Sequence, residues 1–374
     1  MATDPAQIAT LVVAGGFLIA FVFGLVAAKS NFCTMGALAD IVNMGHWGRM
    51  RMWLLAVAVA IAGTAALSAT GQVDLAKSVA QRPNLPWLAL IVGGLLFGIG
   101  MTLAGGCANK NLVRVGGGSV RSLVVLTFVA IASYMTLKGL FGQWRASWLD
   151  PVRVDLGARG WADQGLDTAL AQAFGLEPQA ALAVAAGALV LALLVFVFKD
   201  PRFRGNGLQI ASGVMLGLLV AAGWYVTGHL GYGENPETLE TVFFATNTRT
   251  LESLSFVAPL AYSLELLLLW TDASLHLSFG IASVLGVIAG SLVYALAAGT
   301  FRWEGFASVA DLRSQLVGAV LMGFGGVTAL GCTIGQGVSG VSTLAIGSFL
   351  AIGGIVAGSV ATLKWMLWQA EREA

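Results

Sequence analysis

The sequence predicts an all-α polytopic membrane protein, and three observations carry that prediction. The chain of 374 residues is 57% hydrophobic and only 10% charged, whereas soluble domains carry roughly 25% charged residues. Apolar runs recur along the chain, and each approaches the ~20 residues that span a bilayer. The 49 glycines are typical of closely packed membrane helices and of backbone that breaks within the membrane.

The apolar runs define the expected helices. In chain order they fall at residues 8–28, 52–70, 88–106, 121–140, 180–198, 207–230, 254–270, 277–299, 314–330 and 344–368. The run at 254–270 is the weakest because it contains Pro259 and Glu265. We therefore expect about nine transmembrane helices, a tenth run that enters the membrane only partway, and short re-entrant helices or loops. The first run lacks the positive region of a signal peptide and is expected to be retained.

Basic residues near short loops predict the orientation, because such loops are usually cytoplasmic. The turn at 46–52 and the linker at 199–205 are rich in lysine and arginine, whereas the segment at 141–179 mixes both signs of charge. We expect the first two on the cytoplasmic side and the third outside. With nine spans, the N-terminus is then external and the C-terminus cytoplasmic.

An internal repeat emerges when the cysteines are aligned. A glycine precedes each cysteine at the same distance: Gly24 before Cys33, Gly98 before Cys107 and Gly323 before Cys332. A weaker fourth copy has Gly217, with Val226 in place of the cysteine. Two copies fall in each half of a single membrane domain, 1–374. If residues 141–206 form an external loop and a linking helix, then 8–140 and 207–368 are inverted repeats, a design typical of transporters.

The three cysteines are the candidate functional side chains. A single cysteine in a membrane helix is usually a small apolar residue, but each of these ends an apolar run and precedes small or amide residues. A thiol is a weak donor and a soft ligand, better suited to sulfur than to a hard ion. No zinc spacing accompanies the cysteines, and we expect no metal, cofactor or catalytic constellation.

The neighbours of the cysteines are mostly hydrogen-bond donors. The candidate path residues are Lys29, Asn31, Asn109, Lys110, Asn111, Arg114 and Gln336, and the candidate pore glycines are Gly24, Gly98, Gly106, Gly323, Gly331 and Gly335. Intramembrane lysine and arginine are costly and point to function, although Lys29 and Lys110 have the alternative of extending to the membrane interface. Thiols together with cationic donors indicate a small sulfur oxyanion.

Two acidic residues interrupt the apolar pattern. Asp40 and Glu265 are each expected to pair with a lysine or to relay a proton, or else to lie in a loop and at the interface, respectively. The net charge of +1 gives no indication of nucleic acid, and no nucleotide-binding motif indicates ATP-driven transport.

The cysteine segments also resemble a known family. SNFCTMGALADIV, GGCANKNLVRVGGGS and GCTIGQGVSG are similar to signature segments of the YeeE/YedE family of bacterial inner-membrane sulfur transporters. The resemblance extends across most of the chain, although the central part, 141–206, carries no matching motif. The resemblance implies an hourglass-like fold and uptake of thiosulfate into the cytoplasm past Cys33, Cys107 and Cys332. It also implies a cytoplasmic sulfur-carrier partner of the TusA type. Some relatives are linked to other sulfur or selenium compounds.

Three functions therefore remain open. The first is a transporter of thiosulfate or a related sulfur anion, which is not an enzyme. The second is a membrane sulfurtransferase that relays sulfane sulfur through a cysteine persulfide. The third is a Cu(I) permease, which the ten methionines permit but which no methionine cluster supports.

Overall fold

The computed structural model describes residues 5–236 and 239–373, and nearly all regular structure in them is helical. Eight helical stretches in these residues are long and apolar enough to cross a membrane. The prediction of an all-α polytopic membrane protein is confirmed. The small strands β1 (Asn84–Leu85) and β2 (Val154–Asp155) pair antiparallel, as do β3 (Tyr232–Glu234) and β4 (Thr241–Phe243).

The first half contains two helix–break–helix–helix units. The first unit consists of α1 (Pro5–Ser30), α2 (Thr34–Met44) and α3 (Gly48–Ala69), and the second of α4 (Trp87–Leu103), α5 (Ala108–Gly116) and α6 (Val120–Lys138). The intervening segment contains α7 (Leu140–Trp144), α8 (Leu166–Phe174), α9 (Pro178–Phe198) and α10 (Pro201–Arg204). Short 3₁₀-helical and π-helical turns lie between some of these helices.

The second half repeats this order. A third unit contains α11 (Gly207–Tyr225), a π-helical turn at Val226–Leu230, α12 (Val257–Leu268) and α13 (Phe279–Ala297). The fourth contains α14 (Val309–Thr328), a π-helical turn at Gly335–Gly340 and α15 (Ile346–Glu373). The weak run at 254–270 forms α12, only 12 residues long. The run at 314–330 lies in α14, whose first turns carry Asp311 and Arg313 and which is not among the eight apolar stretches.

The four units pack in reciprocal pairs. Helix α1 packs against α13, and α11 against α3, so the first and last helices of units one and three exchange partners. Units two and four do the same, with α4 against α15 and α14 against α6. A twofold operation that exchanges the two halves would produce this reciprocity.

The glycine that precedes each break lies at one of these crossings. A Cβ on Gly24 would meet the backbone of Val287 in α13, and one on Gly98 would meet the backbone of Ile355 in α15. Gly217 lies in the same way against α3, and Gly323 against α6. Helices approach this closely in membranes where small residues face each other. The repeated glycine is therefore a packing position in every unit.

A second set of glycines joins α4 to α14. Gly100 lies against the carbonyl oxygen of Gly318, and Gly93 against that of Gly325. The same sequence offset that relates Cys107 to Cys332 relates Gly93 to Gly318 and Gly100 to Gly325. This central crossing thus maps onto itself when the halves are exchanged.

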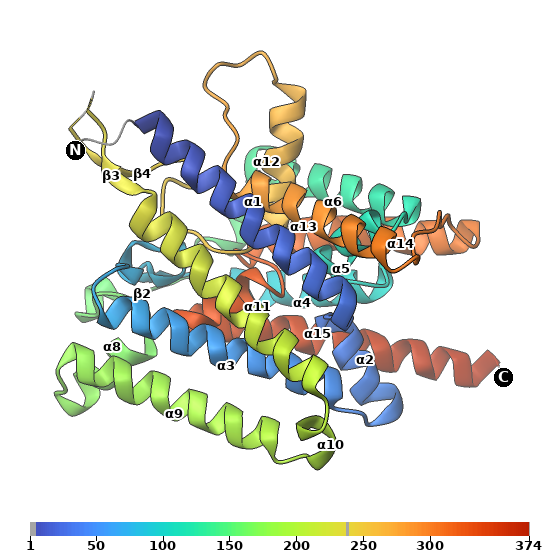
Figure 1. Cartoon of the computed structure of the whole chain (residues 1–374), viewed down its shortest axis with the longest axis horizontal. Coiled ribbons are helices and arrows are strands. Elements are labelled where there is room, and N and C mark those ends of the chain that lie inside the picture. The colour runs from blue at the N-terminus through green and yellow to red at the C-terminus, as the bar shows by residue number, and fades with distance from the viewer. Residues whose placement is uncertain (1–4, 237–238, 374) are drawn as a thin grey trace.

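The two basic turns lie together at one end of the molecule. The guanidinium of Arg51 donates hydrogen bonds of 3.0 Å to the carbonyls of Phe196 and Val197 at the end of α9, and lies 3.7 Å from the carboxylate of Asp200. Figure 1 shows α2 and α10 at the end of the molecule where the C-terminus emerges, with the N-terminus at the opposite end. Helix α9 exposes Leu191 and Val195, as a lipid-facing helix does.

Candidate functional site

Each cysteine follows the same kind of helix break. The residue two positions before it has a left-handed backbone: Asn31 (φ 55°), Gly105 (φ 66°) and Leu330 (φ 59°). The residue immediately before the cysteine donates its N–H to the carbonyl oxygen five positions earlier. The N–O distance is 3.2 Å for the bond from Phe32, 2.9 Å for that from Gly106 and 2.8 Å for that from Gly331. These are Schellman-type helix ends, which satisfy carbonyls that the helix leaves unpaired. The cysteine therefore begins the next segment.

Two of the thiols cap the segment that follows. Cys33 Sγ accepts a hydrogen bond of 3.3 Å from the N–H of Gly36, and Cys332 Sγ accepts one of 3.4 Å from Gly335. Cys107 begins α5 without such a bond. A capping thiol uses its sulfur as an acceptor and keeps its S–H as a donor.

The third unit lacks this break. Helix α11 continues without interruption into the π-helical turn that begins at Val226, the residue in the cysteine position. The described residues thus contain three cysteine breaks, and the weaker fourth copy keeps its packing glycine without the turn.

The three cysteines are unpaired and buried, with exposed fractions of 5% for Cys33 and 1% for Cys107 and Cys332. The side chains of Cys33 and Cys107 contact each other as hydrogen-bonding partners, although they belong to different units. The side chain of Thr333, which follows Cys332, faces the thiol of Cys107. The structure therefore brings the three motifs together.

Two cations flank this cluster. The ammonium of Lys110 donates a 2.6 Å hydrogen bond to Asn31 Oδ1, and the guanidinium of Arg114 donates one of 2.9 Å to the carbonyl of Gly105. Each of these bonds is made to a residue with a left-handed backbone two positions before a cysteine. Both positive charges also interact electrostatically with the thiol of Cys33. Within the described ranges neither forms an ion pair with a carboxylate. Lys29 is exposed in the last turn of α1 and does not join the cluster.

The predicted amides divide into two groups. Asn111 Nδ2 donates to the carbonyls of Gly106 (3.0 Å) and Cys107 (3.2 Å), and Gln336 Nε2 donates to that of Ala329 (2.7 Å). These two amides hold the turns that contain their cysteines. Asn109 is buried, and neither its amide nitrogen nor its amide oxygen has a hydrogen-bond partner among the described residues.

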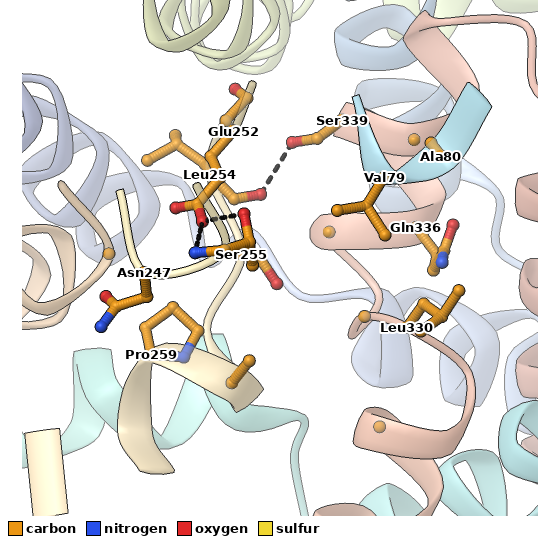
Figure 2. Close-up of a pocket in the computed structure, with 18 of the residues that line it drawn as sticks. Val79, Ala80, Asn247, Glu252, Leu254, Ser255, Pro259, Leu330, Gln336 and Ser339 are labelled. Carbon is orange, nitrogen blue, oxygen red and sulfur yellow. Dashed lines mark hydrogen bonds between the residues drawn. The ribbon is translucent and has the colours of Figure 1, made fainter. Parts of the chain in front are cut away.

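A cavity of about 200 Å³ approaches Cys332 from the side of the loop before α12. Its lining includes Gly331 and Gly335, which flank the cysteine. Figure 2 shows Glu252, Leu254 and Ser255 on one wall, and Ser339, Gln336 and Leu330 on the other. The hydroxyl of Ser339 donates a 2.7 Å hydrogen bond to the carbonyl of Leu254 and joins the two walls.

Glu252 is the acidic group of this cavity. Its carboxylate accepts hydrogen bonds from the N–H of Thr248 (2.9 Å) and from the hydroxyl of the same residue. Burial raises the pKa of the Glu252 carboxyl above its ordinary value, because desolvation disfavours the charged form. Sequence reasoning missed this residue, since no motif marks its loop.

The two acidic residues expected to pair or to relay a proton both form ion pairs. Asp40 lies in α2, rather than in a loop, and pairs with Arg49. Glu265 lies in α12 and pairs with Lys138. Neither pair contacts a thiol directly, although the charge of Arg49 acts on Cys33 and on Lys110.

Comparisons with known proteins bear on the same motifs. The chain matches the family described as sulphur transport over residues 29–361. It is 25% identical over 372 residues to the thiosulfate transporter TsuA of Escherichia coli (strain K12), covering 94% of each chain. It is 26% identical over 356 residues to the thiosulfate transporter TsuA of Spirochaeta thermophila, covering 95% of this chain and 98% of the relative.

The family match includes all three cysteine breaks and most of the residues between them. The resemblance indicated by the cysteine motifs is thereby confirmed, as is the prediction of a transporter rather than an enzyme. The protein is a multi-pass membrane protein that belongs to the sulphur transport family.

Proposed function

We propose that the chain takes up thiosulfate, or a closely related small sulfur anion, across the bacterial inner membrane along a path lined by Cys33, Cys107 and Cys332. The observation that carries this proposal is the convergence of three helix breaks, each with a buried thiol, beside two cations that have no carboxylate partner among the described residues. Both relatives are named as thiosulfate transporters, and their similarity extends across almost the whole chain.

The contacts support an order along the path. The anion enters the cavity beside Cys332, passes Thr333 and Cys107, reaches Cys33, and leaves past Lys110 and Asn31. Gly106, Gly331 and Gly335 allow close backbone approach at the breaks, whereas Gly24, Gly98 and Gly323 contribute by fixing the helix spacing around them.

The chemistry of the path suits an ion that must be bound and released. Thiosulfate carries a terminal sulfur and three oxygens, and S–H groups donate only weak hydrogen bonds. Several weak sites allow an anion to enter and to leave. The N-termini of α2 and α5 at Cys33 and Cys107 add favourable dipoles for an anion, and Lys110 and Arg114 supply positive charge.

The direction of uptake follows from the orientation proposed for the chain. The basic turns, joined through Arg51, are placed on the cytoplasmic side by the distribution of charge, together with the C-terminus. The cavity beside Cys332 then faces outward. A sulfur-carrier protein of the TusA type as cytoplasmic recipient rests on the family resemblance alone.

A sulfane-sulfur relay is the second candidate. The contact between Cys33 and Cys107 is the observation that favours it, because sulfur passes between cysteines only when they touch. Mass spectrometry of the protein after exposure to thiosulfate distinguishes the two functions. The transport proposal predicts unmodified cysteines. A relay, in which a thiolate takes the terminal sulfur of thiosulfate and sulfite leaves, predicts a mass increase of one sulfur atom on one cysteine together with released sulfite.

Uptake of labelled thiosulfate into liposomes that contain only this protein tests the proposal directly. With the unmodified chain we expect the label to enter until it equilibrates, and with the variant Cys33→Ala, Cys107→Ala, Cys332→Ala we expect it not to enter. A fluorescent tag and protease protection confirm that the variant is inserted correctly. If that variant transports at the parent rate, the cysteines are packing residues and the proposed path is wrong.

A further inference from the structure

Two buried threonines beside the cysteines have hydroxyls that form no hydrogen bond of normal geometry in the part of the chain that the structure describes. Thr34 follows Cys33 and Thr333 follows Cys332, so a Cys-Thr pair occurs at two of the three breaks. Their exposed fractions are 2% and 0%. Among the described residues, the Thr333 hydroxyl has only the thiol of Cys107 beside it, which is a weak hydrogen-bonding group.

This property separates them from every other buried threonine that the structure describes. The others all donate their hydroxyl to a carbonyl or to another hydroxyl, and they are Thr64, Thr102, Thr136, Thr227, Thr328, Thr343 and Thr362. Most of them use the carbonyl four residues earlier in the same helix. Buried polar groups in native proteins nearly always have partners, so the two exceptions require an explanation.

The helix breaks explain why these hydroxyls are free. Thr34 is the first residue of α2, so the carbonyl four positions earlier belongs to the end of α1, on the other side of the break. Thr333 likewise follows directly after the break at Leu330. An unpaired buried hydroxyl destabilises the folded protein. The hydroxyls of Ser78, Ser122 and Ser348 are unpaired too among the described residues, but of these groups only Thr34 and Thr333 directly follow a cysteine, and this position favours a ligand that binds them.

We infer that Thr34 and Thr333 donate hydrogen bonds to the oxygen end of the transported anion while the cysteines contact its sulfur end. This inference rests on the proposed function. Thiosulfate has one soft end and one hard end, and a hydroxyl is the harder donor of the two groups in each Cys-Thr pair. Thr333 directly follows Cys332 in the sequence, and its side chain faces Cys107. An anion bound between these two thiols therefore has its oxygens within reach of the Thr333 hydroxyl.

The break at Cys107 has the same arrangement, with an asparagine in place of the threonine. Ala108 follows Cys107, and the next residue is Asn109, whose buried amide has no partner among the described residues. Each cysteine is thus followed within two residues by one buried, unpaired polar side chain. The recognition unit is therefore a pair, a thiol with a neutral oxygen-binding group, and it occurs at all three breaks.

Thr333→Val tests the inference, because valine keeps the shape of threonine and removes only the hydroxyl. Purified full-length protein is used to measure labelled thiosulfate uptake in liposomes and thermal unfolding in detergent without thiosulfate. We expect KM to rise about tenfold, the effect of losing one hydrogen bond to a charged group. The unfolding midpoint changes little, because only the weak contact with the Cys107 thiol is lost. Thr333→Ser restores KM, and Thr34→Val behaves as Thr333→Val does.

Thr362→Val is the matched control. Its hydroxyl donates a 2.8 Å hydrogen bond to Gly358, so its removal should lower the unfolding midpoint and leave KM unchanged. If the unmodified protein takes up no thiosulfate, the proposed function fails. If it transports thiosulfate and Thr333→Val has the same KM, the inference is overturned. A loss of uptake that follows a lowered midpoint, without rescue by serine, also overturns it.

Discussion

At the scale of single residues, the site is defined by the residue two positions before each cysteine. Asn31, Gly105 and Leu330 all have a positive φ, but they differ in how well they tolerate it. Glycine adopts this conformation freely, and asparagine does so more readily than most residues, whereas leucine is strained by roughly 1–2 kcal/mol. The third break therefore stores strain beside Cys332.

This difference predicts opposite effects of two substitutions. Leu330→Gly should stabilise the folded protein by about 1 kcal/mol, because it relieves backbone strain at a side chain that is 47% exposed. Gly105→Ala should destabilise by a similar amount through strain alone, since the nearest atom to an added Cβ is 3.8 Å away. Thermal unfolding in detergent measures both. Equal signs for the two variants would contradict the assignment of strain to these turns.

The charge of Lys110 gives the next prediction. Lys110→Ala should reduce uptake at low thiosulfate concentration about tenfold, and Lys110→Arg should retain most of it, because the proposed role is to attract an anion. Raising the ionic strength should reduce uptake by the unmodified protein and have less effect on the alanine variant. If alanine and arginine variants transport equally, the side chain only extends to the membrane interface.

Glu252 predicts a dependence on pH. Its raised pKa means that the folded protein holds this proton more tightly than the unfolded chain does. Stability therefore falls as pH rises from about 4.5, the ordinary value, through the higher folded value. The ionised carboxylate also repels an anion in the cavity, so KM should rise over the same interval.

Glu252→Gln should remove both the fall in stability and the rise in KM with increasing pH. Its KM should be lower than that of the parent at neutral pH. Uptake and thermal unfolding measured between pH 5 and pH 8 test this. An unchanged KM profile in the glutamine variant would show that the cavity is not on the anion's route.

At the scale of helices, four glycines fix the distances between elements. Gly24, Gly98, Gly217 and Gly323 hold the four reciprocal crossings. Sequence reasoning found them as a repeated register because they recur at a constant spacing from the break. It predicted three of them as pore glycines, which remains a prediction; that they also lie at helix crossings was not visible in the sequence, which does not reveal which side of a glycine faces a neighbouring helix.

Gly98→Ala should therefore destabilise the protein by about 1–3 kcal/mol, the usual effect of overpacking, because the added methyl meets the backbone of Ile355. Gly353→Ala is the control in a neighbouring helix, where no atom lies within 4 Å of the added methyl. It should be neutral or mildly stabilising through helix propensity. Size-exclusion profiles and unfolding midpoints measure both, and similar results for the two variants would contradict the packing role.

Other features of the site were accessible to sequence reasoning only in part. The apolar runs predicted most helices, and the cysteines predicted the breaks, because both signals are local. The contact between Cys107 and Thr333 joins residues from opposite halves of the chain, and no local pattern encodes such a pairing. The unpaired hydroxyls were missed because a sequence does not show which buried groups lack a partner. The Cys-Thr pair that occurs at two of the breaks was nevertheless visible in the sequence.

At the scale of the whole molecule, the reciprocal packing is what an inverted repeat of 8–140 and 207–368 would produce, and orientation gives a direct test of it. His46→Cys and Arg204→Cys, each in a background without native cysteines, should react with a membrane-impermeant maleimide only from the cytoplasmic side. Ala158→Cys should react only from outside. All three positions are exposed. Labelling of positions 46 and 204 from opposite sides would refute the proposed topology.

The unbroken helix at Val226 makes the two halves chemically unequal. The first proposed repeat supplies two thiols and the second supplies one, so the thiols are unevenly divided between them. An uneven row of sites changes how fast the anion crosses in each direction at a given concentration difference. It cannot alter the equilibrium between the two compartments, because a passive route obeys detailed balance. Accumulation of sulfur inside the cell therefore has to be driven by a coupled gradient or by reactions that consume the anion after it arrives.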